Sequence, residues 1–191
     1  MSTSGVGLQS PVKKNAVHER NLQLQDVWLA SVPIVLSIHI WSILHVLEEV
    51  PAWILRLTIW ELFGAIAYTQ VFAMLESMVV LVLFIILYFI LPKRWFARQF
   101  VSATSLIVLV ATSWAIAAHN YDQIIRNWGA RQFLPWLILV VTSMALALIL
   151  VFRSEKIKNF LSILVKRAAV LSAVYLLIDG LSLIIIMLRN L

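Results

Sequence analysis

Long apolar runs alternate with short polar segments along most of the chain. Residues 1–25 are polar and contain no apolar run. Five apolar stretches follow, each close to the roughly 20 residues that cross about 30 Å of hydrocarbon as a helix. They cover residues 27–47, 67–91, 100–118, 133–152 and 168–188. The pattern predicts an all-α polytopic integral membrane bundle, with a polar cytoplasmic tail over residues 1–25 and a five-helix transmembrane domain over residues 26–191.

Residues 51–66 are also largely apolar and do not fit this pattern directly. Together with the second span they make a run that is too long for one crossing, with Gly64 as its evident breaker. Trp53, Trp60 and Phe63 are residue types that favour the level of the lipid headgroups. We therefore expect an interfacial helix over residues 52–63, after the first span, or a long extension of the second helix. The alternative is an additional, sixth span.

The composition excludes the main classes of soluble protein. Of the 191 residues, 62% are hydrophobic and 13% are charged, and this charged share is about half that of a typical soluble domain. A single core cannot bury so much apolar surface, which excludes a soluble enzyme and a disordered regulator. The net charge of +6 does not indicate nucleic-acid binding, because Lys and Arg lie at the ends of apolar runs. The chain has no cysteine, so disulfides and thiolate chemistry are excluded.

The positive charges favour one orientation in the membrane. Eleven of the 15 Lys and Arg residues lie in the tail, between the second and third spans, or between the fourth and fifth spans. The remaining four are Arg56, Arg126, Arg131 and Arg189. By the positive-inside rule we expect a cytoplasmic N-terminus, an external C-terminus and Trp28 at the cytoplasmic interface. A sixth span would place the cations of residues 93–98 opposite those of the tail, which favours five spans.

Three ionisable residues lie near mid-depth in the predicted spans: His39, Glu76 and Asp179. Each costs at least about 2.5–3.5 kcal/mol there on the insertion scale. No Lys or Arg lies at this depth, so the two carboxyl groups are either protonated or partnered by His39. Tyr175 and two serines share the helical face of Asp179, and this face is expected to point into the bundle. The candidate intramembrane polar site, His39, Glu76, Asp179 and Tyr175, serves either as a proton relay or ligand site, or as hydrogen bonds that join helices.

A second group of ionisable residues lies at the external end of the first span. His45, Glu48 and Glu49 share one helical face, and His119 ends the third span on the same side of the membrane. Such a cluster can bind a divalent metal or act as an acid–base pair. The alternative, which we favour, is a solvated helix end. We therefore assign no metal and no cofactor.

Two patterns carry resemblances to known families. The wider one covers residues 30–190 and consists of Pro33, Glu49–Pro51, the sequence Leu-Pro-Lys-Arg at 91–94, His119–Asp122 and Arg131–Trp136. It resembles the N-terminal five-span membrane module of bacterial sulfatase-like and lipoteichoic-acid-synthase-like proteins. That module anchors an external hydrolase or phosphoglycerol-transferase domain, so the resemblance implies an anchoring role in a bacterial plasma membrane, with the partner on a separate chain. The sequence His45-x-x-Glu48-Glu49 is similar to the HxxEE signature of a family of small, uncharacterised multispan proteins.

Two functions follow as hypotheses. The first is a non-enzymatic multispan subunit or anchor that assembles with a partner membrane or envelope protein, or with further copies of itself, in the lipid bilayer. The second is a small intramembrane enzyme or carrier for a lipid or an apolar amine, which uses His39, Glu76 and Asp179. No catalytic residue is assigned, and nucleic acid is not expected as a partner.

Overall fold

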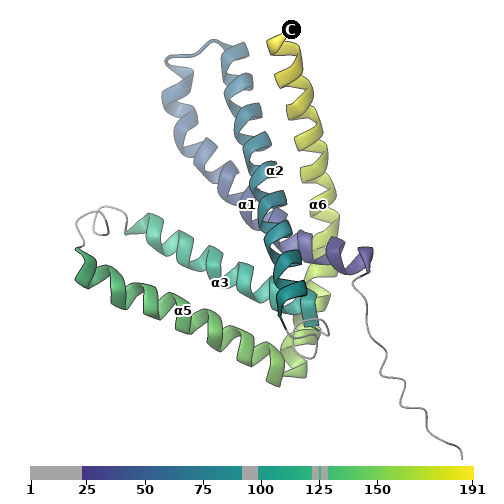
Figure 1. The fold of residues 1–191 in the computed structure, drawn as a ribbon. Coiled ribbons are helices and arrows are strands. Elements are labelled where there is room, and N and C mark those ends of the chain that lie inside the picture. Colours follow the sequence, from purple (N-terminus) through teal and green to yellow (C-terminus); the bar gives the residue numbers. More distant parts are fainter. Residues whose placement is uncertain (1–22, 92–98, 122–124, 126–128) are drawn as a thin grey trace, which may run out of the picture.

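The computed structural model describes residues 23–91, 99–121, 125 and 129–191. Every regular element among them is a helix (Figure 1). The helices are α1 (Leu24–Ile54), α2 (Ile59–Ile90), α3 (Phe100–Asn120), α5 (Ala130–Arg153) and α6 (Glu155–Asn190). All five are long and apolar enough to cross a membrane. The all-α bundle of five candidate spans is confirmed, whereas most of the predicted tail, residues 1–22, lies outside the described residues.

The connection between α1 and α2 differs from the expected interfacial helix. Helix α1 continues through Pro51, which lacks a backbone N–H, and ends at Ile54. Helix α2 begins at Ile59, directly after the N-cap Thr58. Thr58 Oγ1 accepts a hydrogen bond from the N–H of Glu61, and Glu61 Oε2 lies 2.8 Å from the N–H of Thr58. This capping box starts α2, so residues 52–63 are divided between two spanning helices and form no helix of their own.

The last helix is longer than its apolar part. Helix α6 has 36 residues, which corresponds to about 54 Å, well above the roughly 30 Å of a hydrocarbon core. The cations of residues 156–167, which the sequence analysis placed between the fourth and fifth spans, therefore lie on the first turns of α6 itself. Lys158 Nζ contacts Glu155 Oε1 at 2.7 Å. Glu155, Lys156 and Lys158 lie on the first turn of this helix, and Lys166 and Arg167 follow two turns later, directly before the apolar segment.

The helices form two arms that share a common base. Helices α1, α2 and α6 pack on one another, and α3 joins them through α1 and α6. Helices α3 and α5 run side by side away from the other three, as the teal and green ribbons in Figure 1 show. At the base, Tyr88 of α2 packs against Phe100 of α3, with ring centroids 5.4 Å apart. The other buried members of this apolar core are Ala30, Ile34, Phe84, Ala103 and Val108.

We call the group of α1, α2 and α6 the first arm. Its end opposite the base is closed by polar contacts between α2 and α6. Asn190 Nδ2 donates a hydrogen bond to the hydroxyl of Tyr68 at 2.9 Å. The side chain of Arg189 lies directly on Gly64, where a Cβ would meet it. Gly64 therefore leaves room on α2 for the side chain of Arg189.

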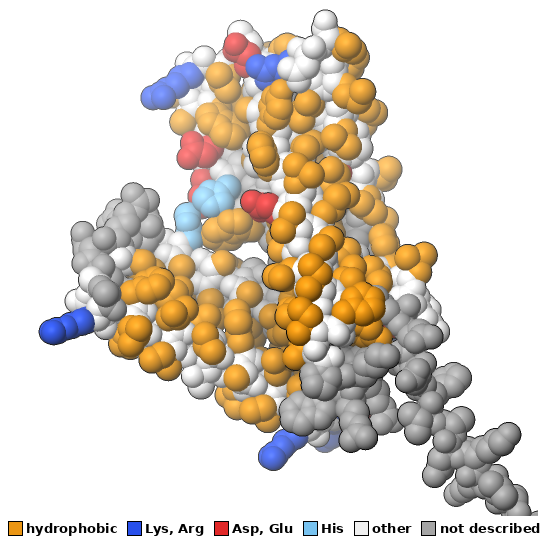
Figure 2. All heavy atoms as spheres, in the orientation of Figure 1, with side chains coloured by type: hydrophobic (Ala, Val, Ile, Leu, Met, Phe, Trp, Pro, Cys, Tyr) orange, Lys and Arg blue, Asp and Glu red, His pale blue; other side chains and the backbone are white. Residues whose placement is uncertain are grey.

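The described surface has the distribution of a membrane protein. Hydrophobic side chains cover the flanks of both arms, and Lys and Arg lie at the ends (Figure 2). A hollow separates the two arms in this view, and histidine and acidic side chains gather along it. We call this hollow the notch.

Candidate functional site

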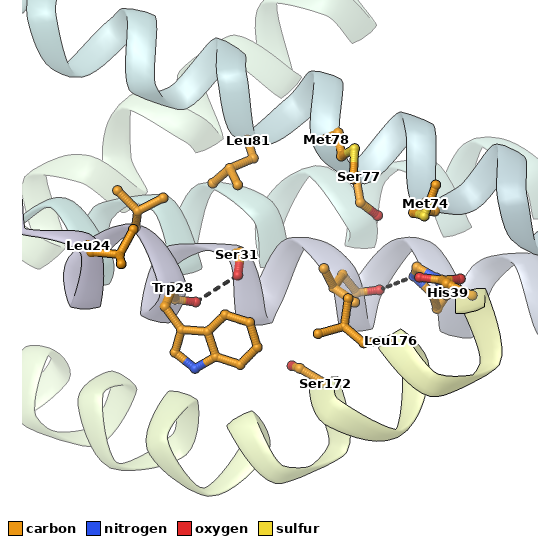
Figure 3. Close-up of a pocket in the computed structure, with 13 residues that line it drawn as sticks. Leu24, Trp28, Ser31, His39, Met74, Ser77, Met78, Leu81, Ser172 and Leu176 are labelled. Atoms are coloured by element: carbon orange, nitrogen blue, oxygen red, sulfur yellow. Dashed lines mark hydrogen bonds and ion pairs between the residues drawn. The ribbon is translucent and has the colours of Figure 1, made fainter. Parts of the chain in front are cut away.

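An apolar groove runs between α1, α2 and α6, with a volume of about 450 Å³. Leu24 and Trp28 lie toward one end of it and His39 lies at the other (Figure 3). The full lining is Leu24, Val27, Trp28, Ser31, Val35, His39, Met74, Ser77, Met78, Leu81, Ser172, Leu176 and Asp179. The volume and the mostly apolar lining fall within the usual range of small-molecule pockets.

His39 and Asp179 form an ion pair or hydrogen-bonded pair at the inner end of the groove. Nε2 of His39 lies 2.9 Å from Oδ1 and 3.2 Å from Oδ2 of Asp179. His39 is 0% exposed and Asp179 is 3% exposed. The ring of Tyr175 lies beside that of His39, with centroids 5.2 Å apart. Helices α1 and α6 thus bring together three of the four residues of the predicted intramembrane site.

The second ring nitrogen of His39 determines how many protons the pair holds. Nδ1 lies 2.9 Å from the carbonyl oxygen of Val35. A carbonyl oxygen can only accept, so Nδ1 carries a hydrogen and donates it. The contact from Nε2 to Asp179 then needs one further proton, on either the ring or the carboxyl group. The pair is an imidazolium with a carboxylate or a neutral imidazole with a carboxylic acid, and both forms have no net charge.

Glu76 does not join this site, although sequence reasoning placed it at the same depth. It is exposed on the outer side of α2, while its neighbour Ser77 is buried. The buried face of α2 carries Gly64, Ala67, Gln70, Ala73 and Ser77. Because successive residues of a helix are about 100° apart, Glu76 points away from this face.

Two serines flank the pair inside the groove. Ser77 Oγ donates to the carbonyl oxygen of Ala73 at 2.8 Å. Ser172 is 2% exposed, and its Oγ has no hydrogen-bond partner among the described residues. In Figure 3 the hydroxyl of Ser172 lies on the groove side of α6, between Trp28 and Leu176. A buried polar atom without a partner is costly, and Ser172 belongs to the lining of the groove.

The predicted external cluster lies in the notch. Glu48 Oε2 is 3.7 Å from Nδ1 of His45 and 3.9 Å from Nε2 of His119. The rings of His45 and His119 pack edge to face, 5.1 Å apart, and both also contact the ring of Trp41. Glu49 is exposed and does not join them. All three ionisable side chains are roughly half exposed, so this cluster has a very different environment from the buried pair.

Metal binding is not supported by this arrangement. In residues 23–91, 99–121, 125 and 129–191, no group of three or more His, Asp and Glu is placed to hold a metal ion. Asp122, an acidic residue three positions after His119 in the sequence, lies outside the described residues. The arrangement of His45, Glu48 and His119 is therefore a set of loose polar contacts at the surface of the notch.

Sequence reasoning missed several features of the site. Trp28, expected only as an interfacial anchor, lines the groove together with Met74 and Met78. The small and polar residues of the buried α2 face recur at nearly helical spacing, and this signal of a packed helix seam is readable from the sequence. Thr58 and Glu61 match the capping-box pattern before an apolar run, which also predicts where α2 begins.

The five apolar helices and the buried polar pair among them define a multi-pass integral membrane protein. Comparisons of the chain with protein-family models, with curated proteins and with solved structures find no match.

Proposed function

We propose that this protein binds a lipid-like amphiphile in the groove between α1, α2 and α6, as a carrier or as a small intramembrane enzyme. The observation that carries this proposal is the apolar groove that ends at the buried His39–Asp179 pair. The groove supplies an apolar surface for a chain or ring system. The pair supplies a hydrogen-bonding contact, and one exchangeable proton, at a fixed point.

The side chains along the groove suit an apolar ligand of variable shape. Met74 and Met78 are unbranched and adapt to irregular ligand surfaces. Trp28 has an amphipathic ring of the kind that favours the membrane interface. From Trp28 to His39 the helix rises by about 16 Å. A single alkyl chain of medium length therefore reaches from the interface to the pair.

Blocking the groove tests this proposal. Met78 lines the groove and is 54% exposed, whereas its neighbour Val79 is 69% exposed and does not line it. We expect Met78→Trp to reduce the bound fraction of dodecylamine and dodecanol at least tenfold, measured by native mass spectrometry of protein released from nanodiscs. Val79→Trp is the matched control and should bind as the wild type does. Equal binding by the wild type and by Met78→Trp would overturn the proposal.

A second function, as an assembling subunit or anchor, is favoured by the notch. Trp41, His45, Glu48 and His119 leave polar and aromatic surface half exposed between the two arms. Among the described helices, α5 packs mainly against α3 and α6. The resemblance of residues 30–190 to a five-span anchoring module agrees with this role. Light scattering in mild detergent should then give a protein mass well above the 21.7 kDa of one chain, and the mass of a lone chain would contradict it.

The proposed orientation has a cytoplasmic N-terminus and an external C-terminus, in a bacterial plasma membrane. The basis is the charge asymmetry between the two ends of the spans. Because the chain has no cysteine, single cysteines report the side directly. A cysteine at Ser2 should be protected from impermeant thiol reagents, and a cysteine at Asn190 should be labelled. The reverse result would invert the orientation.

A further inference from the structure

We infer that the groove selects amphiphiles with a basic amine over those with an acidic or hydroxyl head, because the His39–Asp179 pair can give its one proton to the ligand. This inference rests on the proposed binding function and names the class of its ligand. It follows from the proton count and from the hydrogen-bonding capacity of the groups at the inner end of the groove.

The proton moves in a balanced step. An amine enters as the free base and takes the proton that lies between Nε2 of His39 and the carboxyl group of Asp179. An N–H bond forms on the ligand, and the N–H or O–H bond within the pair breaks. The product is an ammonium beside the carboxylate of Asp179 and a neutral His39, whose Nδ1–H still donates to Val35. The site has no net charge before or after this step.

After this transfer the inner end presents acceptors toward the ligand. The carboxylate oxygens and Nε2 of His39 accept hydrogen bonds, and an ammonium group has three donors and no acceptor. A hydroxyl head has one donor. A carboxylate head has none, and the groove lining contains no Lys or Arg among the residues that the structure describes. The order of affinity should therefore be amine, then alcohol, then carboxylic acid.

Among the described residues, the ionisable groups on the neighbouring helices do not replace the His39–Asp179 pair as the source of the proton. On α6, the facing ionisable group is Tyr175, whose ring lies beside His39. On α2, Glu76 is exposed and outside the groove lining. On α3, the buried residues Thr104 and Ser105 do not ionise in this pH range, and His119 lies at the far end in the notch.

A second observation points to a ligand in the same groove. The hydroxyl of Ser172 is buried, faces the groove and has no partner among the described residues. It lies two turns before Asp179 on α6, about 10 Å along the helix. This unsatisfied group marks the groove as a place where polar atoms bind, in addition to the apolar contacts of lipid tails.

The test compares three probes of equal chain length in nanodiscs: dodecylamine, dodecanol and dodecanoic acid, each with bromine on the last carbon. Bromine near Trp28 quenches its fluorescence, and the signal lost in Trp28→Phe isolates this contribution. We expect dodecylamine to bind at least tenfold more tightly than dodecanol, and dodecanoic acid to bind most weakly. Between about pH 6 and about pH 8 free dodecylamine is protonated, so binding releases one proton and the affinity should rise about tenfold per pH unit.

Two variants separate the role of the pair from that of the fold. In Asp179→Asn the amide can still donate to Nε2 of His39, but it cannot lose or take a proton. We expect this variant to bind dodecylamine and dodecanol equally, with the pH dependence of empty nanodiscs. Glu76→Gln makes the same change on an exposed face and should keep the wild-type preference.

The outcomes distinguish the two proposals. Equal binding of amine and alcohol by the wild type, or a preference that survives in Asp179→Asn, would overturn the amine inference and leave the groove proposal standing. The absence of quenching that depends on Trp28 with all three probes would overturn the groove proposal itself.

Discussion

Helix α1 carries two histidines with opposite environments. His39 is completely buried and contacts Asp179 at 2.9 Å. His45 lies six residues further along the helix with 45% of its side chain exposed, and its contact with Glu48 is 3.7 Å. Both pairs combine an imidazole with a carboxylate. They differ in what surrounds them: three packed helices around the first, and the open notch around the second.

This difference in environment determines how strongly each imidazole–carboxylate pair affects the stability of the fold. An interaction between charges is weakened by a polar environment, so an exposed pair contributes at most about 1 kcal/mol. In a buried pair, each partner also prevents the other from remaining as an uncompensated charge. We therefore expect the removal of one partner of the His39–Asp179 pair to destabilise the fold strongly, and the removal of the charge of Glu48 in the notch to have little effect on folding.

The largest expected effect comes from removing one member of the buried pair. Asp179→Ala leaves His39 without its partner and should lower the free energy of unfolding by about 3–5 kcal/mol. Glu48→Ala is the matched change in the notch and should cost less than about 1 kcal/mol. Denaturant titration in mixed micelles, followed by tryptophan fluorescence, measures both.

If Asp179→Ala fails to fold, the double variant His39→Leu with Asp179→Leu keeps the comparison testable. It replaces both polar partners by apolar side chains, so no unpaired group remains, and most of the lost stability should return. A double variant as unstable as Asp179→Ala would show that the pair is not the source of the effect.

A smaller effect is expected from the aromatic packing of the notch. Trp41→Ala removes ring contacts with both His45 and His119. Each aromatic pair contributes about 0.5–1.5 kcal/mol, so the two contacts together predict a loss of about 1–3 kcal/mol, measured by thermal unfolding in detergent. A loss as large as that of Asp179→Ala would mean that the notch is coupled to the fold as tightly as the interior.

Removal of the unpaired hydroxyl of Ser172 should raise the free energy of unfolding, whereas the changes above lower it. Ser172→Ala removes a buried polar atom that lacks a partner, so the protein without ligand should gain up to about 1 kcal/mol in stability. Ser143 is the control, because its hydroxyl accepts a hydrogen bond from Trp114 and donates one to Val140. Ser143→Ala should destabilise by about 1 kcal/mol, measured in the same unfolding experiment. Destabilisation by Ser172→Ala would show that its hydroxyl is already satisfied.

The smallest expected effect is that of Glu48→Gln. The amide keeps the size of the side chain and loses only its charge, at contacts of 3.7 and 3.9 Å to half-exposed histidines. The stability should change by a few tenths of a kcal/mol, in the range of exposed ion pairs, and less at high salt. A change of several kcal/mol that persists at high salt would show that the notch cluster affects stability as strongly as the buried His39–Asp179 pair.

The helical content and the number of spans could be predicted from sequence. Apolar runs near 20 residues have few stable alternatives in a membrane, because every backbone polar group must find a partner within the span. The boundaries were less certain. The predicted last span began at residue 168, where the apolar run begins. Helix α6 begins earlier and includes Lys156 to Arg167, since a helix persists in water beyond the hydrocarbon.

The candidate site was only partly predictable. The face of α6 that carries Tyr175 and Asp179 follows from helical spacing, and it lies against α1 in the structure. Depth alone could not choose between Glu76 and His39 as the partner of Asp179. Glu76 lies on α2, which also contacts α6. However, Glu76 is exposed, and the buried face of α2 carries the next residue, Ser77.

The sequence by itself determined the class of this protein, its five helices that are long and apolar enough to span a membrane, and the polar face of the last one. These properties depend on local composition and on helical periodicity. The tertiary structure decided which residues meet: His39 with Asp179, His45 with His119, and Trp28 with the two methionines of α2 along one groove. Such contacts depend on how each helix is rotated and tilted against its neighbours. Rotation and tilt result from packing across the whole bundle, so no single span encodes them.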